Sequence, residues 1–460
     1  MLLFSGAFTR SSYRVTTGAK RSRAYSGTIW SVLGYGGSQV IRLASNLILT
    51  RLLFPEIFGL MALVQVILQG LKMMSDIGIS TSVIRDERGD EPDFLNTAWT
   101  LQIIRGLLIW FISVLAAYPM AVAYDSTELV LLIPLVASTV IFQGFTSPAV
   151  LSLKRHIQLD KLLLWEISSQ FITTVITVVA VWYFRSIWAI AISGVIGAFL
   201  TCLLSFKLPY KHSIKLSIDL TSASTMLFFG KWIFVSSLVT LIINKGDVLV
   251  LGLFLSKADL GVFAIAAIWS RMAYELLQKI NQQVMTPLYA MVFRENRSSV
   301  KAQMAKTRVR LLALSLPIII ALVFGGQLLI DILYDSRYQS AGWMLQVLAV
   351  GTIAAAITAT SANALLSFGD SFGYMIFQVV SGVLLVICML VGGSEYGVAG
   401  LIAGVSISKF ISYPVLVVFL VRHNIWLPKV DGAAVLFTSV VIGFGLWWLG
   451  GLNIPLADNG

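Results

Sequence analysis

Long apolar stretches separated by short polar intervals run through most of the chain. A membrane-spanning helix needs roughly 20 mostly apolar residues to cross about 30 Å of hydrocarbon. By this measure the pattern predicts thirteen spans, at residues 28–52, 58–82, 97–120, 128–152, 162–184, 187–206, 222–253, 258–285, 306–332, 341–367, 372–391, 397–421 and 433–450. The expected fold is therefore an all-α polytopic membrane protein with about 12–14 transmembrane helices.

The first twelve segments form two groups of six that share a weak internal repeat. A shift of 202 positions places Leu53 on Leu255 and Gly59 on Gly261. Because six helices separate the copies, both have the same orientation in the membrane, as in transporters built from parallel repeats. We predict two pseudo-symmetric six-helix lobes around a central cavity. The predicted divisions are a basic N-terminal tail 1–27, an N-lobe 28–206, a cytoplasmic linker 207–221, a C-lobe 222–421 and an extension 422–460 with one further apolar helix.

Composition narrows the class of protein. Hydrophobic residues make up 57% of the chain and charged residues only 12%, and the mean hydropathy is +0.86. Average soluble chains carry about 25% charged residues, so a soluble enzyme, a disordered chain and a nucleic-acid-binding domain are excluded despite the net charge of +11. Most basic connections alternate to the side of the N-terminal tail, which the positive-inside rule places in the cytoplasm. The opposite, periplasmic side receives the connections containing Glu128, Lys257 and Asp335.

Residues that carry catalysis or hold metal ions are scarce. Cys202 and Cys388 lie inside apolar runs, where cysteine usually packs as a small core residue. His156, His212 and His423 lie in connecting segments without metal-ligand spacing. The sequence contains no GxxxxGK[ST], HExxH or GxSxG motif. We therefore predict a protein that is not an enzyme, with no catalytic residues, no metal site and no bound cofactor.

Charged side chains inside the predicted spans are the main functional candidates. Each costs about 2.5–3.5 kcal/mol at the centre of a membrane helix, so such residues normally face the bundle interior or an aqueous cavity. Seven of these residues are basic and four acidic, so not every cation can have an acidic partner. Arg42, Lys245, Arg271 and Lys409 lie nearest the middle of their spans. Guanidinium and ammonium groups suit a phosphate, pyrophosphate or acidic-sugar cargo.

Polar stripes at helical spacing extend this set, because residues three or four positions apart share one helix face. They add cavity-lining or ion-coupling candidates: Asn46, Lys72, Asp76, Arg105, Asn244, Asp247 and Glu275. A purely structural role stays open for some charged positions. Glu275 has the spacing of an i,i+4 ion pair with Arg271 or Lys279, and Glu166 and Lys279 lie close enough to the cytoplasmic boundary to snorkel.

The first half of the chain resembles a known family. The stretches TRLLFPEIFGLMALV, MMSDIGISTSVIRD and DFLNTAWTLQIIRG, within residues 50–106, are similar to the polysaccharide transporter (PST) branch of the Wzx-type oligosaccharide flippases. This branch belongs to the MOP superfamily, which also contains the MATE exporters and the lipid II flippase MurJ. The counterparts in the second half are INKGDVLVLGLFLSKADLGVFAIA at 243–266 and ELLQKINQQVMTPLYAMVFRE at 275–295.

The resemblance implies two lobes that rock between inward-open and outward-open states. It implies a substrate of undecaprenyl pyrophosphate linked to an oligosaccharide, moved from the cytoplasmic to the periplasmic leaflet of a bacterial inner membrane for exopolysaccharide, capsule or O-antigen synthesis. Arg42, with one or more of Lys245, Arg271 and Lys409, would then hold the pyrophosphate. The implied partners are membrane lipids, a polysaccharide polymerase and a chain-length regulator, and no nucleic acid.

Several alternatives remain open from the sequence. The chain could be a MATE-like small-molecule exporter, a membrane-embedded polysaccharide polymerase or ligase, or a non-transporting scaffold for polysaccharide-assembly enzymes. Short external connections argue against the enzyme, and an excess of buried cations argues against export of a cation. The sequence leaves undecided whether Asp76, Asp247 and Glu275 neutralise cations or couple transport to a proton or sodium gradient. It also leaves undecided whether the thirteenth segment spans the membrane.

Overall fold

All regular structure in the described part of the chain is helical. A computed structural model describes residues 36–75, 78–156, 158–210, 212–224, 226, 241, 245–280, 300–367 and 370–449. A helical segment 36–52 is followed by α2 Pro55–Met74, α3 Ile79–Arg85, α4 Pro92–Ala123, α5 Leu129–Gly144, α6 Ala149–Arg155, α7 Leu159–Phe184 and α8 Ile187–Ser205. The second half contains a helical segment 245–254, α10 Lys257–Ile280, α12 Val300–Leu333, the 3-10 helix η2 Ser336–Tyr338, α13 Ala341–Ser367, α14 Ser371–Arg422 and α15 Pro428–Leu449.

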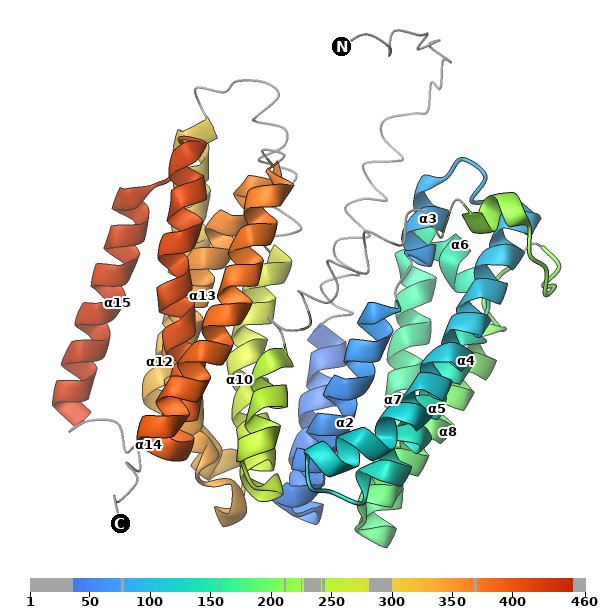
Figure 1. The fold of residues 1–460 in the computed structure, drawn as a ribbon, viewed down its shortest axis with the longest axis horizontal. Helices are drawn as coiled ribbons and strands as arrows, with labels where there is room; N and C mark the ends of the chain where they lie inside the picture. Colours follow the sequence, from blue (N-terminus) through green and yellow to red (C-terminus); the bar gives the residue numbers. More distant parts are fainter. Residues whose placement is uncertain are drawn as a thin grey trace, which may run out of the picture.

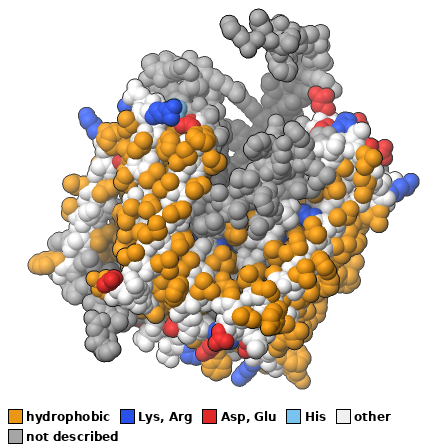
Figure 2. All heavy atoms as spheres, in the orientation of Figure 1, with side chains coloured by type: hydrophobic (Ala, Val, Ile, Leu, Met, Phe, Trp, Pro, Cys, Tyr) orange, Lys and Arg blue, Asp and Glu red, His pale blue; other side chains and the backbone are white. Residues whose placement is uncertain are grey.

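These helices form a multi-pass membrane protein. Within the described ranges, seven helices are long and apolar enough to cross a membrane, or eight if the bent pair α5 and α6 counts as one span. On the face shown in Figure 2, hydrophobic side chains cover much of both lobes, and most charged side chains lie toward the two ends of the molecule. The predicted all-α polytopic fold is confirmed. The predicted number of thirteen helices is approximate, because α14 alone contains two predicted segments and other segments lie partly outside the described residues.

Two predicted spans, 58–82 and 128–152, are interrupted at residues that disfavour a continuous helix, and α14 is divided where two separate spans were predicted. The predicted span 58–82 is divided into α2 and α3, since Gly78 has a left-handed backbone conformation with φ 66°. Helices α5 and α6 meet at an angle of 65°. Pro148 lies at this bend, and its ring disfavours helical backbone at the preceding residue. Helix α14 reverses at Gly397, whose φ is 56° and ψ −136°.

The reversal in α14 creates two antiparallel helices that match the predicted segments 372–391 and 397–421. Glycines allow their backbones to touch: a Cβ on Gly400 would overlap the carbonyl oxygen of Gly392, and a Cβ on Gly404 would overlap that of Cys388. Small residues commonly permit such close approach between membrane helices. The Gly400–Gly404 pair is therefore a packing feature of the C-lobe.

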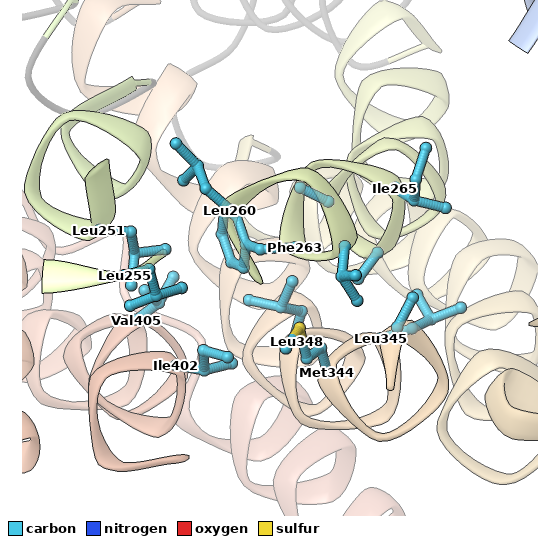
Figure 3. Close-up of a cluster of buried hydrophobic side chains, with 14 of the residues drawn as sticks. Leu251, Leu255, Leu260, Phe263, Ile265, Met344, Leu345, Leu348, Ile402 and Val405 are labelled. Carbon is cyan, nitrogen blue, oxygen red and sulfur yellow. The ribbon is translucent and has the colours of Figure 1, made fainter. Parts of the chain in front are cut away.

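The largest apolar core lies between α10, α13 and the second helix of α14 (Figure 3). Phe263 and Ile265 of α10 are fully buried, as is Leu345 of α13, and Ile402 of α14 packs into the same cluster. Burial of such side chains contributes about 1.5–3 kcal/mol each relative to exposure to water. This core fixes α10 within the C-lobe, and α10 in turn contacts the N-lobe.

The two lobes stand side by side, with α2 and α10 adjacent in the middle of the molecule (Figure 1). Their contact is reciprocal. A Cβ on Gly59 would overlap the carbonyl oxygen of Lys257, and a Cβ on Gly261 would overlap that of Pro55. Lys257 and Gly261 lie 202 positions after Pro55 and Gly59, the shift of the internal repeat. The repeated glycines thus pack against each other where the two copies meet.

Further contacts between the lobes lie at the same end, the side predicted to be periplasmic. We call the following set the external contact: Asn46, Thr50, Leu53, Gly59, Tyr124 and Glu128 of the N-lobe with Leu249, Lys257, Gly261, Tyr334, Arg337 and Tyr338 of the C-lobe. It includes the ion pair between Lys257 Nζ and Glu128 Oε2 at 3.2 Å. It also includes a hydrogen bond from Tyr124 Oη to the carbonyl oxygen of Leu249 at 3.3 Å. The described structure is therefore closed on this side.

Candidate functional site

A charged cluster lies inside the C-lobe, around an ion pair between neighbouring helices. Asp247 comes from the helical segment 245–254 and Arg271 from α10. The Nη2 atom of Arg271 lies 2.6 Å from Oδ2 and 2.9 Å from Oδ1 of Asp247. The side chains are 28% and 13% exposed, so the pair is partly desolvated. Arg271 thus reaches across helices to Asp247, an ion pair that its i,i+4 spacing from Glu275 did not indicate.

Other charged candidates surround this pair. Lys245 lies within electrostatic reach of Arg271, Asp247, Glu275 and Arg42. Lys409 of α14 lies within reach of Asp247 and Arg271. We call these six residues the cationic cluster: Arg42, Lys245, Asp247, Arg271, Glu275 and Lys409. All four basic residues nominated from the sequence for the headgroup site belong to it.

The charge of the cationic cluster is unbalanced. Four basic and two acidic side chains leave an excess of two positive charges. Five of the six come from the C-lobe, and Arg42 comes from the helical segment 36–52 of the N-lobe. An arrangement with excess cations in a partly desolvated space attracts anions, and arginine can grip two phosphate oxygens at once. The cluster can therefore bind an anionic group between the lobes.

Lys72 and Arg105 lie elsewhere, in a pocket of about 270 Å³ inside the N-lobe. We call it the N-lobe pocket; its lining comes from α2, α4 and α5: Lys72, Gln102, Arg105, Gly106, Ile109, Val140, Gln143 and Gly144. Arg105 donates from Nη2 to the carbonyl oxygen of Lys72 at 2.6 Å and from Nε to Ser75 Oγ at 3.1 Å. The charged candidates thus divide between two sites in different lobes.

Asn46 lies at the external contact. Its Oδ1 accepts a hydrogen bond from Tyr334 Oη at 3.0 Å, and the same hydroxyl accepts one from Trp269 Nε1 at 3.0 Å. Asn46 therefore takes part in closing the lobes. The two remaining candidates, Asp76 and Asn244, lie outside the described residues.

The sequence did not indicate that Arg337 and Tyr338, on the C-lobe side of the external contact, bond to the N-lobe. Arg337 donates from Nη2 to the carbonyl oxygens of Thr50 and Arg51 at 3.1 and 3.3 Å, at the C-terminal end of the helical segment 36–52. A cation is favoured there by the helix dipole. Tyr338 Oη donates to the carbonyl oxygen of Leu53 at 3.3 Å. In the sequence, Arg337 was only one charge in an external connection.

A second missed feature is a buried ion pair that attaches the thirteenth segment. Arg308 of α12 pairs with Asp431 of α15, and these side chains are 1% and 4% exposed. Arg308 also donates to Thr360 Oγ1 at 3.3 Å, while Tyr413 Oη donates to Asp431 Oδ2 at 2.5 Å. In the sequence, Arg308 lies at the start of the predicted span 306–332, beside a basic connection on the side predicted to be cytoplasmic. It anchors α15 to the outer edge of the C-lobe (Figure 1).

The fold matches that of known membrane transporters. A lipid II flippase MurJ in an inward closed conformation superposes with a TM-score of 0.71 and 15% identity, covering 92% of this chain and 93% of that one. A multidrug resistance MATE family transporter of the MOP superfamily, in an inward-facing conformation, gives a TM-score of 0.65 and 14% identity over 84% and 94% of the two chains. The chain therefore has the fold of the MOP superfamily transporters.

Sequence comparison identifies the family. Residues 48–342 match the polysaccharide biosynthesis protein family, and the chain belongs to it. Relatives include the succinoglycan biosynthesis transport protein ExoT of Rhizobium meliloti, 20% identical over 70% of this chain and 64% of its own length. The teichuronic acid biosynthesis protein TuaB of Bacillus subtilis is 24% identical over 77% and 74%. The lipopolysaccharide biosynthesis protein WzxC of Escherichia coli is 20% identical over 93% and 89%. The resemblance to Wzx-type proteins of the MOP superfamily is thereby confirmed.

Proposed function

We propose that the protein is a flippase for an undecaprenyl-pyrophosphate-linked oligosaccharide. It moves this lipid from the cytoplasmic to the periplasmic leaflet of the inner membrane by alternating access, for exopolysaccharide, capsule or O-antigen synthesis. The observation that carries the proposal is the cationic cluster, where Arg42, Lys245 and Lys409 lie around the Asp247–Arg271 ion pair of the C-lobe. A pyrophosphate placed there replaces the Asp247 carboxylate on Arg271 and neutralises the excess positive charge.

The relatives and the conformation of the lobes support this proposal. The names of the relatives refer to succinoglycan, teichuronic acid and lipopolysaccharide biosynthesis. The external contact closes the side predicted to be periplasmic. A transporter that loads cargo from the cytoplasm needs this arrangement at the loading step. The excess of cations disfavours a MATE-like exporter of cationic drugs, since such a cargo would be repelled.

Asp247 and Glu275 have two candidate roles in this mechanism. They balance the cations while the site is empty, or one of them binds a proton or sodium ion that drives the cycle. Either role requires binding that differs between the two conformations. We further propose that the product passes to a polysaccharide polymerase and a chain-length regulator in the same membrane, with the N-terminus of the flippase in the cytoplasm.

Reconstitution tests the proposal. Purified protein in liposomes receives a fluorescent undecaprenyl-pyrophosphate oligosaccharide, and exposure of the sugar on the opposite leaflet is followed with a membrane-impermeant sugar-modifying enzyme. Wild type is compared with Arg271→Gln and with Arg310→Gln, which removes an exposed charge of α12 outside the cluster. Charge-assisted hydrogen bonds contribute about 1.5–3 kcal/mol, so Arg271→Gln should slow transport at limiting substrate by roughly ten- to a hundredfold.

The controls separate a site effect from a folding effect. Arg310→Gln should transport the lipid at the wild-type rate. All variants should elute from a size-exclusion column as a single species, and all should unfold at the same temperature. Equal transport by wild type and folded Arg271→Gln would remove the cluster from the mechanism. A cationic fluorescent drug serves as competing cargo, and its transport in place of the lipid would favour the exporter instead.

A further inference from the structure

The linker between the two lobes is attached to the N-lobe. Its residues 213–220, which we call the strap, lie at the outer edge of the N-lobe beside α4 (Figure 1). Three buried polar side chains of α4 bind the strap backbone at every second residue. Asn96 Nδ2 donates to the Ser213 carbonyl oxygen at 3.3 Å, and the backbone N–H groups of Lys215, Ser217 and Asp219 donate to Asn96 Oδ1 at 3.2 Å, Thr100 Oγ1 at 3.2 Å and Thr97 Oγ1 at 2.9 Å. Alternate backbone groups that all face one helix indicate an extended chain.

The side chains of the strap alternate between polar and apolar. Successive side chains of an extended chain point to opposite faces, so the polar and the apolar residues lie on different faces of the strap. The polar residues are Ser213, Lys215, Ser217 and Asp219, and the apolar residues are Ile214, Leu216, Ile218 and Leu220. Leu216, Ile218 and Leu220 are 67%, 50% and 80% exposed. The described part of the chain therefore leaves most of this apolar face uncovered.

The position of the strap along α4 places it at a membrane boundary. Exposed apolar side chains of α4 extend from Ile104 to Val122, a rise of about 27 Å that nearly spans the roughly 30 Å of bilayer hydrocarbon. Thr97 and Thr100 precede Ile104 at helical spacing, on the same outward side of α4. Thr100 lies about 6 Å before Ile104, on the side predicted to be cytoplasmic. The strap therefore crosses the lipid-facing side of α4 at the depth of the headgroups and the first acyl carbons.

The charge of the linker is complementary to that of acidic phospholipids. Residues 207–220 contain Lys207, Lys211 and Lys215 and a single acidic residue, Asp219. The Asp219 carboxylate accepts a hydrogen bond from the backbone N–H of Ser222 at 2.9 Å, at the start of the next helical segment. Lys207 and Lys215 are exposed, and neither forms an ion pair with a carboxylate within the described residues. Lysines beside an exposed apolar face attract anionic lipids when they lie at headgroup depth.

The acidic connection 86–93, which leads into α4, has basic partners outside the linker. Asp86 forms an ion pair with Arg88 at 3.5 Å, and Asp90 forms one with Arg155 at 3.0 Å. These pairs reduce the negative charge of the connection without involving the lysines of the linker. Those lysines thus stay available to an external anion.

We propose that the strap is a membrane anchor that binds acidic phospholipids of the leaflet on the side predicted to be cytoplasmic. Leu216, Ile218 and Leu220 insert among the upper acyl carbons, while Lys207 and Lys215 contact the phosphate groups of the lipids. The bonds to α4 satisfy backbone N–H groups that would otherwise face lipid unpaired. This proposal goes beyond the flippase function, because it concerns lipids of the bilayer rather than cargo.

Measurements of lipid exposure along the strap test the anchor. Leu216→Cys and Ser217→Cys are made separately in the full chain with Cys202→Ala and Cys388→Ala, and each new thiol is labelled with the fluorescent dye NBD. The labelled proteins are placed in nanodiscs of phosphatidylcholine and phosphatidylglycerol. Quenching is measured with iodide in the water and with a nitroxide near the headgroup end of an acyl chain of either lipid. The strap is bound to α4 through its backbone, so either side chain can change without loss of those bonds.

We expect the lipid nitroxide to quench the dye at Leu216→Cys and iodide to quench the dye at Ser217→Cys. At Leu216→Cys the phosphatidylglycerol nitroxide should quench more than the phosphatidylcholine nitroxide, because each lysine favours an anionic leaflet by about fivefold. Lys207→Gln combined with Lys215→Gln should remove this preference, whereas Lys207→Arg combined with Lys215→Arg should retain it. Lys154→Gln, which removes an exposed charge on α6 outside the linker, should also retain it.

Four results would overturn the proposal. Equal quenching at the two positions, by lipid and by iodide, would show that no single face of the strap enters the membrane. Protection of the dye at Leu216→Cys from both quenchers would show that protein, such as a second copy of the chain, covers the apolar face. Equal quenching by the two lipids would remove the selection for acidic phospholipids. Loss of the preference in the arginine pair as well as the glutamine pair would show that the lysines act through structure rather than charge. Failure of cargo transport in liposomes would instead count against the flippase function and leave these quenching results unchanged.

Discussion

Removal of the Asp247 carboxylate should strengthen anion binding by the cationic cluster. Asp247 occupies the guanidinium of Arg271 through contacts of 2.6 and 2.9 Å. An incoming phosphate has to displace this carboxylate and then remains close to its negative charge. Asp247→Asn keeps the size and one acceptor oxygen of the side chain and removes the charge. The excess positive charge of the cluster rises from two to three, counting four basic against one acidic side chain.

The magnitude follows from Coulomb's law. A phosphate that replaces the carboxylate on Arg271 lies about 5 Å from the displaced Asp247. At an effective dielectric constant of about 20, two like unit charges at this distance repel by about 3 kcal/mol. The exposure of Arg271, 28% of its side chain, admits water and lowers this figure. We therefore expect Asp247→Asn to bind inorganic pyrophosphate about ten- to a hundredfold more tightly than wild type.

Isothermal titration calorimetry of the purified protein with inorganic pyrophosphate measures this change in affinity. Asp259→Asn is the matched control, since it removes one carboxylate at the start of α10, where Asp259 accepts a hydrogen bond from Ser256 outside the cluster. This control should bind as wild type does. The same affinity in Asp247→Asn and wild type, with both folded, would show that Asp247 does not compete with the anion. Weaker binding in Asp247→Asn would show that the carboxylate organises the cations rather than competing for them.

Three further predictions concern the lobes and their contact. Arg308→Ala leaves Asp431 buried without its partner, so thermal or denaturant unfolding should show a loss of about 3–5 kcal/mol, and a loss under 1 kcal/mol would contradict the anchoring role. Gly59→Ala should separate α2 from α10 and reduce transport at least tenfold, whereas Gly194→Ala, where a Cβ meets nothing within 4 Å, should transport normally. Hydrogen bonds from Arg337 lower the pKa of Asp335. The ionised Asp335 carboxylate therefore contributes its full stabilisation at any pH above the ordinary aspartate pKa near 4. That stabilisation is lost as the pH falls through the lowered pKa. Spin-label distances across the external contact should stay constant from pH 7 to 5, and widening within that range would contradict this sign.

Much of the fold could be predicted because the membrane restricts what a segment can form. Apolar length decides which segments are helical, so α4, α7, α8, α12, α13 and α15 follow the predicted spans to within a few residues. Interruptions were harder to predict. Gly78 and Pro148 act through backbone conformation within stretches that were predicted as single spans, which hydropathy does not detect. Gly59 and Gly261 were visible as repeated residues, but only their contact shows why glycine is needed there.

The sequence indicated which charged residues belong to the cationic cluster better than it indicated which of them form ion pairs with each other. The high cost of charge in hydrocarbon made Arg42, Lys245, Arg271 and Lys409 stand out, and the structure brings these four together around Asp247. Pairing depends on which helices become neighbours, and local spacing does not reveal this. Arg308 shows the same limit, because a residue next to a loop in the sequence became one of the most buried side chains through contact with α15.

The division of the cationic cluster between the lobes links binding to conformation. Arg42 belongs to the N-lobe, and its charge reaches Lys245 in the C-lobe while the external contact is formed. When the lobes rock apart on that side, the N-lobe moves relative to the C-lobe, so Arg42 changes its distance from the other cations. Because Coulomb energy falls with distance, the affinity for an anion must then differ between the two states. We expect the bound pyrophosphate to favour one arrangement of the lobes, and release to follow once that arrangement is lost.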